Sequence, residues 1–110
     1  MIFAARIRAA AAAAGRPVVL LTGGDGLVSR VRSAVPGLLL IDLDARWLDA
    51  AALISALKAD PATAGVPVVA FGSHLRTEAL AAARAAGAEL VLARSVFVRK
   101  LPELVGHPVS

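Results

Sequence analysis

The stretch Leu38-Leu39-Leu40-Ile41-Asp42, LLLID in one-letter code, carries the strongest indication of the fold. Four apolar residues lead directly into a carboxylate, and Asp44 adds a second carboxylate two positions later. Such a run, preceded by the turn-forming pair Pro36-Gly37, is typical of a strand buried on both faces of a parallel sheet. The acid that ends it is either a reaction centre at the rim of the sheet or an ordinary polar strand end.

Strand-like and helix-like patterns alternate on both sides of this stretch. Short apolar, β-branched runs predict strands over residues 17–22, 38–43, 66–71 and 90–93. Apolar residues at helical spacing predict helices over residues 2–14, 25–35, 50–58, 77–86 and 96–105. Asp49 is expected to cap one helix and Gly87 to end another. The alternation predicts an α/β fold in one domain, residues 1–110, with a doubly wound parallel sheet between two helix layers.

Composition excludes several classes of function. The chain has no cysteine and only two widely separated histidines, which argues against disulfides and zinc. No uncharged stretch approaches the ~18 apolar residues of a membrane span, and residues 2–14 favour a folded helix over a targeting segment. The net charge is +4, but the basic residues are scattered, so we expect no nucleic-acid site. We expect a cytoplasmic protein.

Polar residues or glycine follow the predicted strands at their carboxyl ends. Asp42 closes one strand, Gly72 and Ser73 follow the next, and Arg94 follows the last. Ligands and chemistry collect at this edge of open parallel sheets. Asp42 is therefore placed for chemistry.

From Leu38 to the C-terminus the chain resembles the receiver domain of bacterial two-component response regulators. Asp42 matches the phosphoacceptor aspartate that ends the third strand of that family. The segment at 46–73, RWLDAAALISALKADPATAGVPVVAFGS, and the segment at 81–97, AAARAAGAELVLARSVF, keep the family's order of elements without a gap. The resemblance implies a flavodoxin-like three-layer fold. It places Gly72 at the family's switch Thr or Ser and Arg94 at its phosphate-binding Lys.

Several positions around Asp42 depart from the family pattern. Gly72 supplies no hydroxyl, and Ser73 lies one position late, where a strand side chain would point to the other face. Arg94 replaces the Lys and lacks the Pro that follows it in the family. Arg46 stands at a family Pro position, and Val91 stands at its aromatic switch position. These departures predict a degenerate, or pseudo-receiver, site.

The N-terminal part fits the family only if its first strand is absent. If Thr22 ended the first strand, too few residues would precede Asp42 for the elements that must intervene. Residues 2–14 are therefore assigned to the first helix and residues 17–22 to the second strand. The chain then has four strands. If Met1 is the true start, the family's metal-binding acidic pair is missing, and the second strand must shift toward the third or a partner must supply a strand. If the true start lies upstream, an acidic strand there would carry that pair. We expect a truncated reading frame whose true start lies upstream of Met1.

Alternatives remain open at single residues. Asp42 is either a phosphoacceptor or a strand-end carboxylate that accepts hydrogen bonds from loop amides. Asp44 either lends its backbone carbonyl to a cation or forms a turn. Ser73 or Thr77 is expected to cap the following helix. The candidate partner contacts are Trp47, Val91 and Phe97, with a role as a lid as the alternative for Trp47 and a core position as the alternative for Phe97.

The leading functional hypothesis is a stand-alone, divergent receiver-like module that works by contact with a protein partner or with itself. It would not be an enzyme and would need no cofactor. The alternative is a functional phosphoacceptor in a phosphorelay: Asp42 catalyses its own phosphorylation, Arg94 holds the phosphoryl group and Mg²⁺ is required. An inert product of a truncated gene is the third possibility.

Overall fold

The computed structural model describes residues 9, 18–21, 26–34, 36–44 and 49–106. Its strands are β1 (Val18–Leu21), β2 (Leu38–Asp42), β3 (Val68–Gly72) and β4 (Leu90–Ala93). Its helices are α2 (Leu27–Ala34), α3 (Ala50–Ala59), α4 (Thr77–Ala86) and α5 (Arg94–Gly106). The helix expected over residues 2–14 lies outside the described residues, apart from Ala9.

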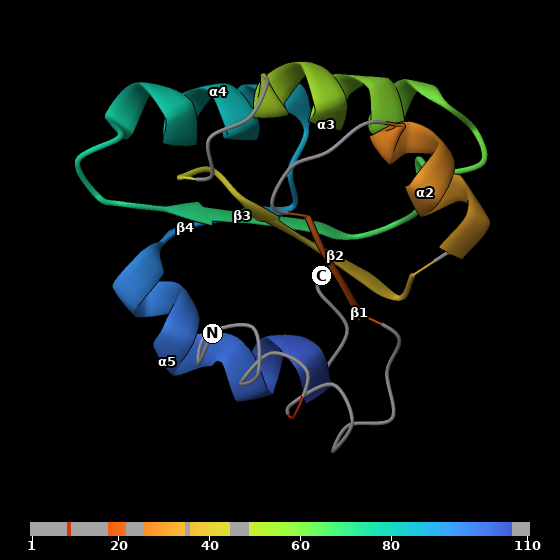
Figure 1. Ribbon diagram of the computed structural model, residues 1–110. Coiled ribbons are helices and arrows are strands. Elements are labelled where there is room, and N and C mark those ends of the chain that lie inside the picture. The colour runs from red at the N-terminus through yellow and green to blue at the C-terminus, as the bar shows by residue number, and fades with distance from the viewer. Residues whose placement is uncertain (1–8, 10–17, 22–25, 35, 45–48, 107–110) are drawn as a thin grey trace.

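The four strands form one parallel sheet in the order β1-β2-β3-β4. Residues 18–21 pair directly with residues 38–41 along the whole of β1. Three successive crossovers advance across the sheet in the same direction, so right-handed connections put α2, α3 and α4 on one face. Figure 1 shows these three helices together above the sheet and α5 below it. The expected α/β fold, with helices on both faces of a parallel sheet, is confirmed.

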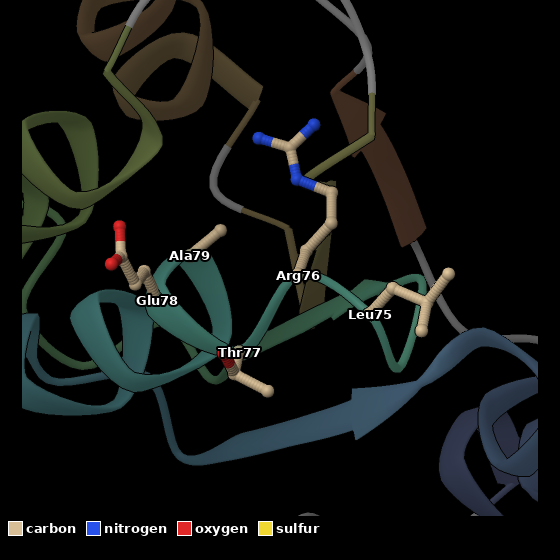
Figure 2. A pocket seen from close by; sticks show the side chains of 5 residues that line it. All are labelled: Leu75, Arg76, Thr77, Glu78 and Ala79. Carbon is tan, nitrogen blue, oxygen red and sulfur yellow. The ribbon is translucent and has the colours of Figure 1, made fainter.

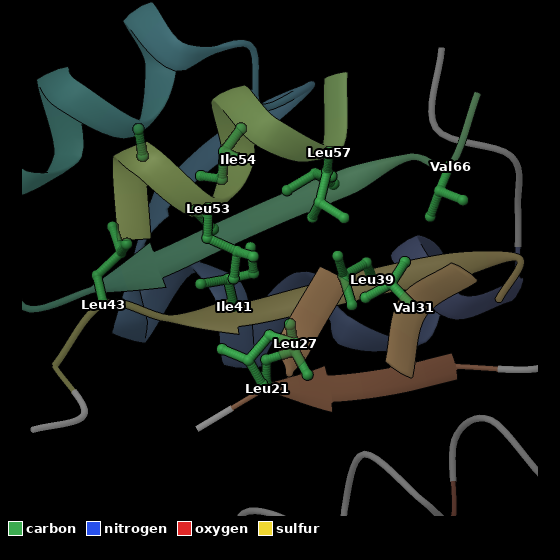
Figure 3. Packing of buried hydrophobic residues seen from close by; sticks show 13 residues of the cluster. Leu21, Leu27, Val31, Leu39, Ile41, Leu43, Leu53, Ile54, Leu57 and Val66 are labelled. Atoms are coloured by element: carbon green, nitrogen blue, oxygen red, sulfur yellow. The ribbon is translucent and has the colours of Figure 1, made fainter. Parts of the chain in front are cut away.

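Alternation along β2 divides the core into two layers. Leu39 and Ile41 point toward the face covered by α2, α3 and α4, where they pack with Leu53, Ile54 and Leu57 (Figure 3). Leu38 and Leu40 point toward α5 and pack with a second cluster of buried residues, Val69, Phe71, Phe97, Leu101 and Leu104. All four apolar residues of β2 have 0% exposure. The LLLI run therefore serves both layers at once, as expected for a strand covered on both faces.

Element boundaries follow local chemistry. Asp49 caps α3 by accepting a hydrogen bond from the Ala52 N–H, and Gly87 ends α4 with a left-handed φ of 117°. Both expectations are confirmed. The expectation that Ser73 or Thr77 caps α4 is wrong, because Arg76 occupies the N-cap position and makes no side-chain cap.

Candidate functional site at the carboxyl ends of the strands

Asp42 is the last residue of β2, and its side chain is 16% exposed. Its Oδ1 atom accepts a hydrogen bond from the Asp44 N–H at 2.9 Å, which turns the chain immediately after the strand. The same atom accepts a second hydrogen bond from Arg94 Nη2 at 2.7 Å. Asp42 therefore accepts a hydrogen bond from a loop amide, as expected for a strand-end carboxylate. It also accepts one from Arg94, which directly follows β4.

The Asp44 side chain folds back over the neighbouring strand β3. Its carboxylate accepts hydrogen bonds from the Ser73 N–H, at 3.0 Å to Oδ1 and 2.9 Å to Oδ2. It also accepts from Arg94, at 3.3 Å from Nε and 3.1 Å from Nη2, and Arg76 Nε lies 4.0 Å away. The side chain of Asp44 thus joins the ends of β2, β3 and β4.

Gly72 makes this position of Asp44 possible. A Cβ atom placed on Gly72 would lie 3.1 Å from Asp44 Oδ1 and 3.1 Å from the Cβ of Leu43, closer than nearly all real contacts of this kind. The residue that lacks the family's hydroxyl therefore provides space for a carboxylate. This role of Asp44 was not predicted from the sequence. An acid just after one strand and a glycine at the end of the next would have indicated it, because the glycine leaves space for the carboxylate.

Arg94 is positioned by the packing beneath it. It is the first residue of α5 and directly follows β4, so its side chain starts at the rim of the sheet. Its guanidinium carbon lies 5.1 Å from the centroid of the Phe71 ring, within the range of a cation–π contact. Phe71 in turn stacks on Phe97, with ring centroids 4.1 Å apart and an interplanar angle of 6°. Both rings are fully buried, and the guanidinium packs against the Phe71 ring.

The expected site residues Asp42, Asp44, Gly72, Ser73 and Arg94 lie together at one rim of the sheet. The Ser73 hydroxyl is directed into its own loop, where it accepts a hydrogen bond from the Leu75 N–H at 3.2 Å, while the Ser73 N–H points to Asp44. Ser73 thus contributes a backbone donor, and its hydroxyl serves the loop.

The three candidate partner contacts have different outcomes. Phe97 has 0% exposure and belongs to the core, so the expectation that it contacts a partner is wrong. Val91 is half-buried and packs against the core on the side of α3 and α4. Trp47, like the family-pattern departure at Arg46, lies outside the described residues.

Among the described residues, the side chains at this rim do not fit a divalent cation. Mg²⁺ is held by carboxylate and other oxygens in octahedral geometry. Here the Arg94 guanidinium already lies between the two carboxylates, within hydrogen-bond distance of both. Two carboxylates and the guanidinium groups of Arg94 and Arg76 also balance in formal charge. In the described part of the chain no three His, Cys, Asp or Glu residues are grouped as a metal site.

An open hollow of 590 Å³ lies beside this rim, at the start of α4 (Figure 2). Its lining consists of Leu75, Arg76, Thr77, Glu78 and Ala79. Leu75 is 78% exposed and is the one large hydrophobic side chain exposed among the described residues. It stands on the short loop that Asp44 holds through the Ser73 N–H.

No family model and no curated protein matches the chain. Solved structures do match it. The Mn(2+)-bound form of response regulator Rcp1 is 18% identical, with a TM-score of 0.52 over 82% of this chain and 89% of that chain. The phosphorylated cyanobacterial phytochrome response regulator RcpA is 14% identical, with a TM-score of 0.55 over 83% and 89%.

A third structure is the signal receiver domain of a DNA-binding response regulator (merR) from Colwellia psychrerythraea 34H. It is 22% identical, with a TM-score of 0.56 over 72% of this chain and 68% of that one. No helix among the described residues is both long enough and apolar enough to traverse a bilayer. At these identities the likeness is one of architecture, and the chain has the flavodoxin-like α/β fold of response-regulator receiver domains.

Proposed function

We propose that the chain is a divergent, cytoplasmic receiver-like module of signal transduction that acts mainly through protein–protein contacts and carries out little or no phosphoryl transfer. Its fold supports the first part of the proposal, because the matching structures are response regulators and a receiver domain. The ion-pair network at the carboxyl rim supports the second part.

The observation that carries the proposal is the Arg94 guanidinium, bonded to Asp42 at 2.7 Å and to Asp44 at 3.1 Å. A carboxylate that accepts a phosphoryl group needs an available oxygen, and the incoming group needs cations and N–H donors to stabilise its charge. Asp42 Oδ1 already accepts two hydrogen bonds, and Asp44 already occupies the Ser73 N–H. The groups that would serve the reaction are therefore engaged with one another.

A contact surface is available at the same end of the sheet. Leu75 projects from the loop between β3 and α4, with exposed His74 and Arg76 as its neighbours. An exposed leucine between two polar residues fits a small apolar anchor with a polar rim. The occupant is either another protein or a second copy of this chain.

The alternative is a functional phosphoacceptor, in which Arg94, already within reach of Asp42, would hold the incoming phosphoryl group. In that reaction an Asp42 oxygen forms a bond to the phosphorus of a donor, and the bond from phosphorus to the leaving group breaks, with the electron pair departing on the leaving group. Arg94 and the Ser73 N–H would both have to leave Asp44 first. Matching structures were solved in Mn(2+)-bound and phosphorylated forms, so this class of chemistry occurs on the same architecture.

A beryllofluoride titration in the presence of Mg²⁺ separates the two functions. Beryllofluoride mimics a phosphoryl group on a carboxylate, and its binding is followed by ¹⁹F NMR. We expect no saturable signal from the wild-type protein and none from the matched control Asp42→Asn. Tight binding by the wild type that disappears in Asp42→Asn would establish the phosphoacceptor and reject the contact-only function.

Light scattering over a range of concentrations identifies the kind of contact. A mass that rises with concentration in the wild type and stays monomeric in Leu75→Ser assigns the Leu75 surface to self-association. A monomeric wild type would exclude self-association as the contact. A self-associating protein whose mass is unchanged by Leu75→Ser would exclude this surface as the contact.

A further inference from the structure

The Asp44 carboxylate is held in the way that a bound anion would be held. The Ser73 N–H donates to both of its oxygens, and Arg94 donates to Oδ2 from two nitrogens. Arg76 Nε lies 4.0 Å from Oδ1. A backbone N–H and guanidinium groups that converge on one carboxylate are the donors with which proteins bind phosphate-class oxyanions. We call the Ser73 N–H and the Arg94 guanidinium the oxyanion cradle.

Two local features bring Asp44 to the cradle. The Asx turn at Asp42 directs the chain back toward β3, and Gly72 leaves space for the carboxylate above the strand. Because the carboxylate belongs to the same chain, it competes with a free anion at a high effective concentration. A free oxyanion would also meet the negative charge of Asp44 at close range, which further lowers its affinity.

We infer that Asp44 is a built-in ligand of the oxyanion cradle and that a free phosphate-class oxyanion occupies the cradle once the Asp44 carboxylate is removed. This inference rests on the proposed function, since it explains why the donors that Asp42 would need are already engaged. It also explains how the loop carrying Leu75 keeps its position without an added ligand. Asp44 is in these terms an autoinhibitory residue.

Two substitutions of equal charge test the inference. Asp44→Ala empties the cradle, whereas Asp42→Asn removes the neighbouring negative charge and keeps the side-chain oxygen that accepts from the Asp44 N–H. Both raise the net charge by one, so general attraction of anions to the protein is matched. Inorganic phosphate is titrated into each protein while the Ser73 amide and the Arg94 Nε–H are observed by ¹H–¹⁵N NMR. Constant ionic strength keeps screening equal.

We expect a saturable shift of both signals in Asp44→Ala, with an affinity at least about tenfold higher than in the wild type or in Asp42→Asn. The double variant Asp44→Ala with Arg94→Ala should lose the response. Equal phosphate responses in Asp44→Ala and Asp42→Asn would overturn the inference. If Asp44→Ala does not fold, Asp44→Asn serves in its place and is judged against Asp42→Asn by the same criterion.

Failure of this inference is distinguishable from failure of the proposed function. Beryllofluoride binding by the wild type bears on whether Asp42 accepts a phosphoryl group. The phosphate titration of Asp44→Ala bears on what Asp44 occupies, whatever the wild type does with beryllofluoride.

Discussion

The two rims of the sheet use similar chemical groups for different purposes. At the amino ends of the strands, Lys58 Nζ donates to the Val66 carbonyl at 2.9 Å and to Glu89 Oε2 at 2.8 Å, and Glu89 Oε1 accepts from the Val68 N–H at 2.7 Å. At the carboxyl ends, Arg94 lies between Asp42 and Asp44. Each rim thus joins a cation, carboxylate oxygens and a strand-end amide.

The two rims differ in whether a free anion could replace one of their carboxylates. At the amino rim a single carboxylate and a single cation satisfy the backbone of β3, and removing either leaves a backbone group without its partner. At the carboxyl rim a second carboxylate occupies donors that a free anion could take over. The amino-rim groups therefore stabilise the ends of the strands. The carboxyl-rim donors, in contrast, form an anion site that we infer is occupied by Asp44 of the same chain.

The largest expected effect comes from the aromatic floor of the carboxyl rim. Phe71→Ala removes a fully buried ring that stacks on Phe97 and supports Arg94, so the free energy of unfolding should fall by about 3–5 kcal/mol in denaturant titrations. Phe71→Leu, which keeps most of the volume, is the control and should cost clearly less. Equal losses for the two would show that the volume kept by leucine contributes nothing and that the ring itself carries the stabilisation.

Gly72→Ala tests the space that Asp44 requires. The added methyl group would lie 3.1 Å from Asp44 Oδ1 and should push the carboxylate off the Ser73 N–H, at a cost of about 1–3 kcal/mol. Gly65→Ala is a matched control, because nothing lies within 4 Å of its Cβ position and its backbone is not left-handed. That control should be neutral or slightly stabilising. An unchanged Ser73 amide signal in Gly72→Ala would contradict the prediction.

Glu89→Ala should weaken the amino rim without opening a site. It removes the acceptor of the Val68 N–H and the partner of Lys58, and its 37% exposure limits the loss of unfolding free energy to about 1–2 kcal/mol. Phosphate should bind this variant no better than the wild type. Glu103→Ala, on an exposed part of α5, is the control and should change stability by less than about 0.5 kcal/mol. A phosphate response in Glu89→Ala would erase the distinction between the rims.

Much of the fold could be predicted because its signals are local. The LLLI run and the Gly87 stop act through their immediate neighbours, and the expected bounds of α4 agree with the structure. Interactions between distant segments were not predictable in the same way. Asp44 bonds a residue 29 positions away, and its place depends on the missing side chain of Gly72. Gly72 was interpreted only as the loss of a hydroxyl, whereas its physical effect is to leave room.

The smallest expected effect concerns a third ion pair, in which Arg32 at the end of α2 contacts Asp60 beyond the end of α3. The Arg32 side chain is 53% exposed. The hydrogen bond from Arg32 holds the pKa of Asp60 below its ordinary value, with help from the Ala62 N–H. A lowered pKa in the folded state stabilises the protein above the unfolded pKa of about 3.9, and this gain is lost as the pH falls through the folded pKa.

Arg32→Gln should therefore be slightly less stable than the wild type near neutral pH and equally stable once Asp60 is protonated. Thermal unfolding at both pH values measures this, with Arg99→Gln on the exposed face of α5 as the control. A difference that persists unchanged at low pH would show that Arg32 stabilises the protein by packing and would remove the electrostatic link between the two helices.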